Sequence, residues 1–257
     1  MNIVVCVKQV PEEIRINKKT GALIREGIKG IMNPCDKNSL ELAVTLKEKH
    51  GGKITLVSMG PQDVESTLTH GLAMGADQAV LLCDRRFAGA DTLVTSFILA
   101  KAIEKLGDFQ LVLCGRETAD SGTQHVGPQV AHYLKIPQIT CVIDLKCFTP
   151  VDGNLRAKRQ LKDEYETVET GLPTLATVLK GINEPRMPTY LDIYEAAKKD
   201  THKWCMEDLG LREELVSPTR IINVFTPETK RKCKMLKGSV EEMSRGLVQE
   251  LKNKELL

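Results

Sequence analysis

The sequence predicts an α/β fold in which a mostly parallel sheet is covered by helices on both faces. Up to about residue 145, short apolar runs of strand length alternate with longer amphipathic runs. This alternation is typical of repeated βαβ units. The chain has 257 residues, which is long enough to bury a sizeable core because the buried fraction of the surface rises with chain length.

The first predicted strand is the apolar run IVVCV at residues 3–7. A helix is predicted within the run NPCDKNSLELAVTLKEKHGG, which begins at Asn33 and ends at Gly52. Four apolar residues gather on one face of this helix at helical spacing. They are Leu40, Ala43, Val44 and Leu46. The glycine pair at its end can stop the helix.

The same alternation continues through the next five elements. Strands are predicted at residues 54–59, 78–83 and 109–114, with helices at residues 64–76 and 90–107 between them. In the second of these helices the predicted core-facing residues follow the helical period. They are Leu93, Phe97, Ala100 and Ile103.

A short helix containing Val130, Ala131 and Leu134 leads to a strand at residues 137–145. A hairpin around Asp152 and Gly153 then follows, with further strands that join the same sheet or its edge. Residues 183–199 read as a loop and a short helix.

Beyond Asp200 the chain has few apolar runs, a lone Trp204, a basic patch at residues 230–237 and an amphipathic helix at residues 239–252. This tail cannot bury much of its own surface, so we expect it to pack on another body.

Composition excludes several broad functions. A formal net charge of +2 from 36 basic and 34 acidic residues gives no field that would collect nucleic acid or an anionic membrane. The eight cysteines include no CxxC pair, so neither a disulfide framework nor a zinc site is expected. The first run, MNIVVCVKQV, is too short for the apolar region of a signal peptide and lacks a cleavage site, so no signal peptide is expected. No apolar run approaches the length of a membrane span. We therefore expect a cytoplasmic protein that is not inserted in a membrane.

Three predicted strands end in similar ways, at Cys6 to Lys8, at Met59-Gly60 and at Gly115. In a parallel sheet such ends meet at one edge, where the following helices begin with unpaired N–H groups. The loop GRETADSGTQHVGP at residues 115–128 adds hydroxyls, the flexible Gly122, and a Gly127-Pro128 pair that suits an N-cap and a first helical position. This loop suits a phosphate or pyrophosphate. An ordinary polar loop is the alternative that spacing leaves open.

Known nucleotide and catalytic motifs are missing from the sequence. It contains no GxGxxG, GxxxxGK[ST], GxSxG or HExxH, so neither a standard dinucleotide fold nor a P-loop enzyme is expected. We predict no catalytic side chain and no metal site, and any chemistry would be that of a bound cofactor. Lys8 is a candidate phosphate or flavin contact, or else a solvated lysine at a strand end.

Six segments, in order, resemble the beta subunits of electron transfer flavoproteins over nearly the whole chain. They are VCVKQVP, GIMNPCDKNSLELAVTLKE, SMGP, LAMGAD, LVLCGRETAD with SGTQHVGP, and LPTLATVLKGINEPR. The resemblance implies a three-layer α/β/α fold of the adenine nucleotide alpha hydrolase-like, Rossmann-like type, with a nucleotide- or FAD-binding domain at residues 1–200. It also implies a C-terminal arm at residues 201–257 that packs on an alpha subunit holding an FAD.

The resemblance also implies two groups of site residues. Together with Lys8, the cofactor-binding group is Cys6, Asn33, Pro34, Cys35, Asp36, Met59, Gly115, Arg116, Glu117, Thr118, Ala119, Asp120, Ser121, Gly122, Thr123, Gln124, His125 and Val126. The group that binds an acyl-CoA or other flavin dehydrogenase is Asn183, Glu184, Pro185, Arg186, Met187 and Tyr190. Tyr190 stands where the family usually has leucine, so the identity of the dehydrogenase stays open. A surface loop backed by a helix is the plainer interpretation of the second group.

The family has two branches, with a structural AMP or a second FAD in the beta pocket. The loop here, with Thr123 and VGP after an SG pair, resembles the second branch, which bifurcates electrons from the substrate NADH to ferredoxin and the alpha-bound FAD. Two alternatives remain, a non-bifurcating carrier with AMP and a nucleotide-binding regulatory homodimer of the stress-protein type. In the favoured interpretation the chain is one subunit of an oxidoreductase complex and is not active alone.

Overall fold

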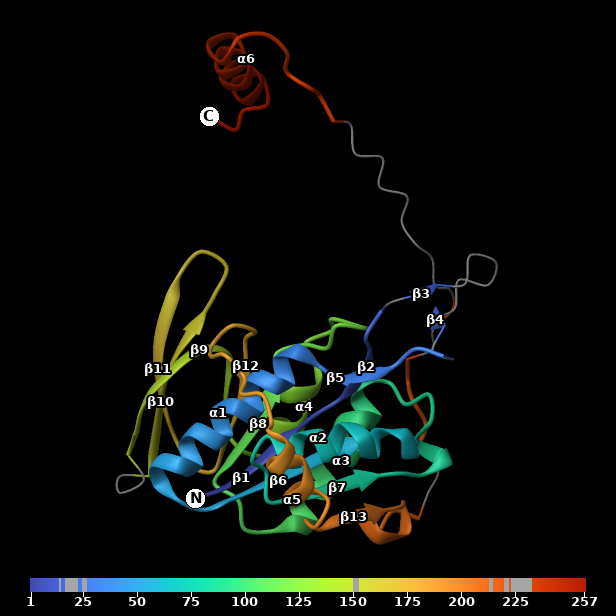
Figure 1. Cartoon of the computed structure of the whole chain (residues 1–257). Helices are drawn as coiled ribbons and strands as arrows, with labels where there is room; N and C mark the ends of the chain where they lie inside the picture. The colour runs from blue at the N-terminus through green and yellow to red at the C-terminus, as the bar shows by residue number, and fades with distance from the viewer. Residues whose placement is uncertain are drawn as a thin grey trace. The chain divides into compact units, whose positions relative to one another are not determined.

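The computed structural model describes residues 1–13, 15–16, 23–24, 27–149, 153–212, 215–219, 222 and 233–257. The chain divides into two compact units, Met1–Ile222 and Asn223–Leu257. The first unit contains the sheet, and the second contains one helix (Figure 1). Each unit is described separately below.

The first unit is built on a nine-stranded sheet with the order β11-β10-β9-β12-β8-β1-β6-β7-β13. Its strands are β1 (Asn2–Cys6), β6 (Lys53–Met59), β7 (Gln78–Leu82), β8 (Leu111–Gly115), β9 (Gln138–Thr149), β10 (Asn154–Gln160), β11 (Tyr165–Gly171), β12 (Thr174–Val178) and β13 (Thr201–Trp204). In this spatial order, each pair of neighbouring strands from β9 through β12, β8, β1, β6 and β7 to β13 is parallel. The β9–β10 and β10–β11 pairs are antiparallel. The predicted mostly parallel sheet is therefore confirmed.

Two small antiparallel pairs lie outside this sheet. They are β2 (Gln9–Pro11) with β5 (Gly30–Met32), and β3 (Arg15–Ile16) with β4 (Leu23–Ile24). The predicted hairpin near residue 153 corresponds to the β9–β10 pair. Gly153 has a φ of +67°, the left-handed conformation that glycine accepts at no steric cost, while Asp152 lies outside the described residues.

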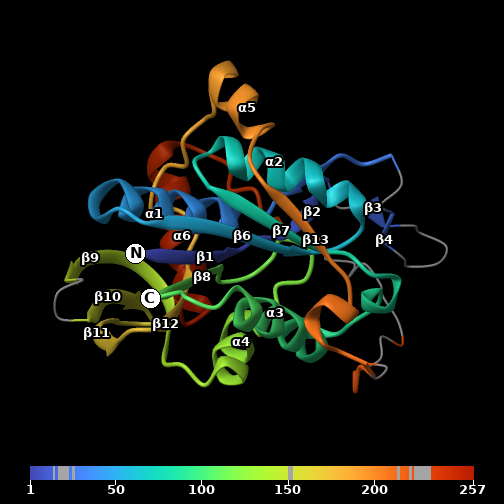
Figure 2. The ribbon, with the colours of Figure 1, turned by 90° about the horizontal axis from the view of Figure 1, so that it is seen from below.

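Helices cover both faces of the sheet, as Figure 2 shows. On one face, α1 (Pro34–His50) and α2 (Glu65–Ala73) bury residues such as Leu40 and Leu68 against the strands. On the other, α3 (Thr92–Leu106) and α4 (Val126–Leu134) bury residues such as Ile98 and Val130. The helix α5 (Tyr190–Ala196) packs against α2 and lies outside it. This arrangement confirms the three-layer α/β/α fold.

The orientation of α3 about its axis differs from the prediction. Leu93, expected in the core, is 39% exposed, and Phe97 is half-buried with its ring edge-on to Tyr133 of α4. Ala100 and Ile103 are buried as predicted, while Val94 and Ile98 take the buried positions expected for Leu93 and Phe97. Because the run is apolar around much of its circumference, its period indicates a helix but does not fix which stripe faces the sheet.

The first unit continues past the boundary expected at residue 200. The strand β13 pairs in parallel with β7, and the 3-10 turn Glu207–Leu209 brings Met206 and Leu209 into the core. Two further 3-10 turns, Gln62–Val64 and Arg85–Phe87, precede α2 and α3. Residues up to Ile222 therefore belong with the sheet.

The second unit contains α6 (Val240–Asn253), which begins with a capping box between Ser239 and Glu242. In its described residues, 233–257, none of the helix side chains is buried, and Val240, Leu247 and Val248 are exposed. Residues 230–232 of the basic patch lie outside the described part of the chain. Across the described ranges, no helix combines the length and apolar character required to cross a bilayer.

Candidate functional site

The candidate site lies where the sheet changes direction of growth. After β1, the chain adds β6 and β7 on one side and then returns to place β8 on the other side. The connections therefore diverge at the carboxyl ends of β1 and β8, and parallel sheets bind ligands at such a switch point. We call this edge the rim, and it comprises Cys6 to Lys8, residues 33–36, Met59-Gly60 and residues 115–126.

Asp36 joins the two central strands at the rim. Its Oδ2 accepts a hydrogen bond of 2.8 Å from the backbone N–H of Lys8, and its Oδ1 accepts one of 3.1 Å from the N–H of Gly115. The side chain is buried, and this burial raises the pKa of Asp36 to about 7 despite the hydrogen bonds. Asp36 therefore supports the rim from beneath, as a fixed acceptor between β1 and β8.

Gly115 is required by this contact. A Cβ on Gly115 would lie 2.2 Å from Oδ1 of Asp36 and 2.8 Å from Cβ of Cys35. Glycine at this strand end thus admits the N-terminus of α1, which is a packing reason and does not depend on a ligand.

Asn33 fixes the start of the loop at residues 115–126. Its Nδ2 donates to the carbonyl of Glu117 at 2.9 Å, and its Oδ1 accepts from the N–H of Ala119 at 3.1 Å. Only 1% of Asn33 is exposed. An amide in this position satisfies one acceptor and one donor of the loop backbone together, which aspartate could not do.

Lys8 pairs with Asp120 across the rim. Lys8 Nζ lies 2.9 Å from Oδ1 and 2.8 Å from Oδ2 of Asp120, whose side chain is 7% exposed. Burial alone would raise the pKa of Asp120, but the hydrogen bonds from Lys8 lower it below its ordinary value. In this structure the Lys8 ammonium is therefore held by the loop.

The middle of the loop is exposed and held by its own short contacts. Thr118 Oγ1 and Ser121 Oγ lie 2.7 Å apart, and the N–H of Gly122 donates to the carbonyl of Thr118 at 2.9 Å. Gly122 has a φ of +62°, and no atom lies within 4 Å of the position that a Cβ would occupy. Residues 121–125 are exposed to solvent. The loop thus presents a main-chain turn that a ligand could approach closely.

The end of the loop is the N-terminus of α4. The helix begins at Val126, so His125 is its N-cap, whereas the sequence suggested Gly127 as N-cap and Pro128 as first residue. Pro128 is tolerated in the first turn because N–H groups there have no partner within the helix. Such a free helix end favours an anion.

Arg116 brings a guanidinium to the same edge. Its Nη2 lies 3.9 Å from Oε2 of Glu117. Among the described residues, its buried Nε has no hydrogen-bond partner. A buried charged donor without an acceptor is costly, so an anionic ligand at the rim would complete its hydrogen bonding.

The remaining predicted cofactor residues lie at the same edge. Cys6 ends β1 and is buried beside its parallel neighbour Cys114, and Met59 ends β6. Burial raises the pKa of the Cys35 thiol, with a further contribution from Asp36, so this thiol stays protonated near neutral pH. Pro34 occupies the first turn of α1. The fold therefore brings all the predicted cofactor-binding segments to one rim.

The predicted partner-binding residues lie elsewhere, beside α1 and at the start of α5. Met187 and Tyr190 are 80% and 94% exposed, and Glu184 is also exposed. Asn183 and Arg186 instead turn toward α1, where they contact Asn38 and Glu41. Pro185 is half-buried between them.

Sequence reasoning missed three contributors. Thr92, at the start of α3, places its hydroxyl 3.3 Å from Nδ1 of His125 and so links the loop to the next helix. The Asp-Thr pair before an apolar run is an N-cap signal that could have indicated this helix end. Asn38 and Glu41 carry no local signal, because their partners are distant in the sequence.

Comparisons with a family profile and with individual proteins all indicate the same protein family. The family profile described as "Electron transfer flavoprotein domain" matches residues 20–208. The chain is 43% identical over 268 residues to the electron transfer flavoprotein subunit beta of Thermoanaerobacterium thermosaccharolyticum, covering 100% of both chains. It is 42% identical to the subunit of the same name from Clostridium acetobutylicum, covering 98% of each. It is also 41% identical to the caffeyl-CoA reductase-Etf complex subunit CarD of Acetobacterium woodii, covering 100% of both.

Proposed function

Since the chain belongs to the electron transfer flavoprotein family, as a beta-type subunit, we propose that it binds an FAD at the rim and pairs with an alpha subunit that holds another. One observation carries the proposal. The Gly115–Val126 loop lies at the switch point of the sheet and leads into the N-terminus of α4, which has no side-chain cap. The loop includes Arg116, whose buried Nε has no hydrogen-bond partner among the described residues. Main-chain donors and a cation at this position suit a diphosphate.

When bound, FAD would supply the chemistry, accepting a hydride from NADH and passing single electrons to ferredoxin and to the alpha-bound flavin. The side chains of this subunit would bind and orient. Thr118, Ser121 and Thr123 offer hydroxyls to phosphate oxygens, and Gly122 leaves space above the turn. The guanidinium of Arg116 would favour added negative charge on the flavin and so raise its reduction potential.

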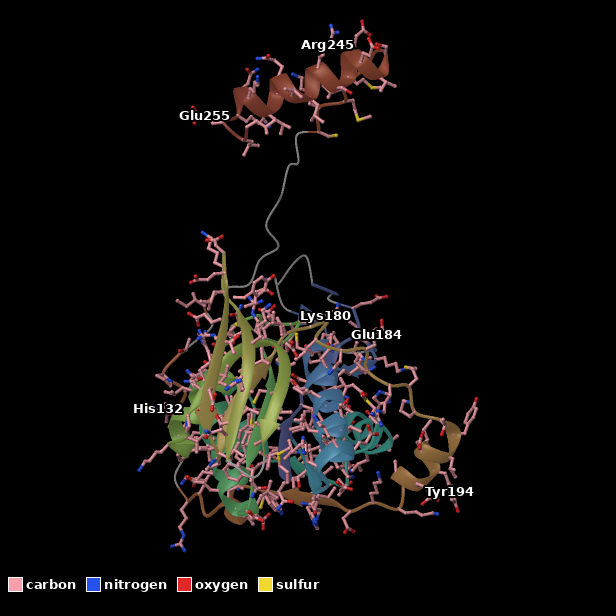
Figure 3. The ribbon with its side chains drawn as sticks, turned by 90° about the vertical axis from the view of Figure 1, so that its left-hand side faces the viewer. His132, Lys180, Glu184, Tyr194, Arg245 and Glu255 are labelled. Carbon is pink, nitrogen blue, oxygen red and sulfur yellow. The ribbon has the colours of Figure 1, made fainter. Side chains whose placement is uncertain are left out.

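Residues 187–194 provide a surface for the flavin dehydrogenase. This short stretch contains five exposed large apolar or aromatic side chains. They are Met187, Tyr190, Leu191, Ile193 and Tyr194. Figure 3 shows Tyr194 on α5, at the outer margin of the first unit. A contiguous exposed apolar patch is typical of an interaction site. The CarD relative is named as part of a caffeyl-CoA reductase complex, which supports an acyl-CoA-type dehydrogenase as the partner.

AMP at the same rim is the second candidate, because a specific contact favours it. The Lys8 ammonium is engaged by Asp120. This cation is therefore not free to neutralise the second phosphate of a diphosphate, and AMP has no second phosphate. In that case the subunit would hold AMP as structure and would not bifurcate. The match of residues 20–208 to the family and the full-length similarity to a beta subunit argue against the third interpretation, a regulatory homodimer of the stress-protein type.

Nucleotide content tests the proposal. The chain would be co-produced with an alpha-type subunit, and the nucleotides of the purified heterodimer would be extracted and separated by chromatography. We expect two FAD molecules per heterodimer. One FAD with one AMP would contradict bifurcation and support AMP as a structural ligand. A beta rim without any nucleotide would contradict both the FAD proposal and the AMP proposal.

A further inference from the structure

The segment from Asn183 to Lys199 is fixed to the body of the first unit at both of its ends. We call it the arch. Its middle contains the exposed apolar residues Met187, Tyr190, Leu191, Ile193 and Tyr194. Its ends, in contrast, are bound to helices α1 and α2 by hydrogen bonds and an ion-pair network. The question is what these two attachments do for the exposed middle.

The first attachment begins with a reciprocal amide pair. Asn38 Nδ2 donates to both the carbonyl and Oδ1 of Asn183 at 2.8 Å, and Asn183 Nδ2 donates back to the carbonyl of Asn38 at 3.0 Å. The N–H of Gly181 also donates to Oδ1 of Asn38 at 3.4 Å. Asn38 is 4% exposed, and buried hydrogen bonds of this kind are costly to break.

Arg186 completes the first attachment with both carboxylates of one helix face. Its backbone N–H and its Nε donate to Oε2 of Glu41 at 2.9 and 3.0 Å. Its Nη1 donates to Oε1 of Glu48 at 2.6 Å, and its Nη2 reaches both carboxylates. The planar guanidinium fork fixes direction as well as distance. Arg186, which was predicted as a partner contact, therefore points toward α1.

The second attachment holds the other end on α2. Ala196 is buried, and Lys199 Nζ donates to the carbonyls of Leu72 and Ala76 at 2.8 and 2.7 Å. These carbonyls belong to the last turn of α2 and the residues just after it. A lysine at a helix C-terminus satisfies acceptors that the helix leaves open. Between the two attachments, α5 begins with a capping box at Thr189 and Asp192.

Helix α1 also carries the rim. Asn33 and Asp36 lie at its N-terminus, and Asn38, Glu41 and Glu48 follow along its length. From Asp36 to Glu48 the helix rises by roughly 18 Å, at about 1.5 Å per residue. A single rigid element therefore holds the cofactor residues at one end and the arch along its side.

From this we infer that Asn183 and Arg186 are positioning residues, which hold the apolar surface of the arch at a fixed place relative to the rim for the incoming flavin dehydrogenase. The inference rests on the proposed function, in which the rim holds a flavin and the arch contacts the partner. The partner contacts themselves come from Met187, Tyr190 and their apolar neighbours. Loss of the Arg186 fork would leave these side chains present and misplaced.

The test uses the full-length heterodimer with a purified acyl-CoA dehydrogenase as the probe. Four variants are compared: Arg186→Gln, Arg186→Lys, Tyr190→Ala and Arg86→Gln. Arg86 is the matched control, because its guanidinium also joins two carboxylates, Asp84 and Glu207, and neither of them belongs to the arch. The readouts are KM and kcat for the heterodimer as electron acceptor, its nucleotide content, and amide hydrogen exchange over residues 187–196.

For Arg186→Gln we expect KM to rise at least fivefold, with kcat within twofold and nucleotide content unchanged. Amide exchange in the arch should quicken. Arg186→Lys should restore part of the KM, because it keeps the charge and loses the fork. Arg86→Gln should match the parent protein in all four readouts. Tyr190→Ala should raise KM without quickening amide exchange over residues 187–196.

Two results separate failure of the inference from failure of the proposed function. If Tyr190→Ala raises KM and Arg186→Gln does not, the arch docks the partner without needing its anchor, and the positioning role is wrong. If Tyr190→Ala leaves KM unchanged, the docking surface itself is wrong and the inference falls with it. Loss of nucleotide in Arg186→Gln would also overturn the inference, because the fork would then be serving the rim.

Discussion

Asp36 accepts main-chain hydrogen bonds from Lys8 and Gly115 with its two carboxylate oxygens. Burial raises its pKa to about 7 from an ordinary value of 3.8. A group whose pKa is raised by folding contributes stability that is complete below the unfolded value and is lost as the pH rises through the folded value. For Asp36 that window extends from about pH 4 to about pH 7.

This sign predicts a pH-dependent difference between the parent chain and Asp36→Asn, which cannot ionise. The free-energy difference of unfolding, parent minus variant, should shrink between pH 5 and pH 8. Urea unfolding of the full chain at several pH values measures it. A difference that stays constant or grows with pH would show that Asp36 is already ionised at pH 5.

Gly115 gives a second prediction at the same scale. A methyl group there would overlap Oδ1 of Asp36 and Cβ of Cys35, at 2.2 and 2.8 Å. Because neither neighbour can withdraw without breaking the rim, Gly115→Ala should destabilise the chain by about 1–3 kcal/mol. It should also reduce the nucleotide content of the purified heterodimer.

Gly171→Ala is the matched control for Gly115→Ala. Gly171 lies in β11, and no atom lies within 4 Å of its Cβ position. Its substitution should change the free energy of unfolding by less than about 0.5 kcal/mol. Equal losses in the two variants would mean that the strand end at Gly115 is more adaptable than its contacts indicate.

At the scale of elements, α6 has exposed apolar side chains, Val240, Leu247 and Val248, which the described residues 233–257 leave uncovered. Beta subunits of this family pair with an alpha subunit, and we propose that these side chains contact it. Leu247→Glu should then weaken the heterodimer at least tenfold, which corresponds to about 1.4 kcal/mol. Gln249→Glu adds the same charge on the opposite side of the helix and should change the dissociation constant less than twofold.

Titration of labelled alpha subunit against each variant measures these constants. Equal weakening by both substitutions would point to a general effect of added negative charge. No weakening by Leu247→Glu would remove α6 from the interface.

The helices also show what sequence periodicity can predict and what it cannot. Periodicity predicted α1, α2 and α3 close to their observed bounds, because each has a buried apolar stripe and both α1 and α3 end at a glycine. For α3 it correctly placed Ala100 and Ile103 in the core, but it also selected Leu93 and Phe97, where the fold buries Val94 and Ile98. Two apolar stripes lie side by side on that helix, and only the positions of the sheet and of α4 decide between them.

At the scale of the whole molecule, the rim was predictable and the anchors of the arch were not. Parallel strand ends must meet at one edge, so Lys8, Met59 and Gly115 could be placed together from the strand pattern. The contacts of Asn38 with Asn183 and of Glu41 with Arg186 each join residues 145 positions apart. No local pattern marks such a pair, since each residue alone reads as an ordinary surface polar group.

Removal of the cofactor supplies a prediction for the complete assembly. A ligand that binds only the folded state stabilises it by about 2.7 kcal/mol at a hundredfold excess over its Kd. The stripped heterodimer should therefore melt at a lower temperature and recover on addition of the native nucleotide. FAD should restore Tm more fully than AMP if bifurcation is correct, and the reverse order would favour the structural role.

The strand β1 comes before the other strands of the sheet in this sequence and lies in the middle of the sheet. Ile3 pairs with Ile54 on one side and with Leu111 on the other. Neither edge of β1 can form its hydrogen bonds until β6 and β8 have been synthesised. Pairing between strands that are distant in the sequence slows folding. The rim cannot assemble before its last residue, Val126, has emerged, so during translation the nucleotide can be captured only after more than half of this unit, Met1–Ile222, has been made.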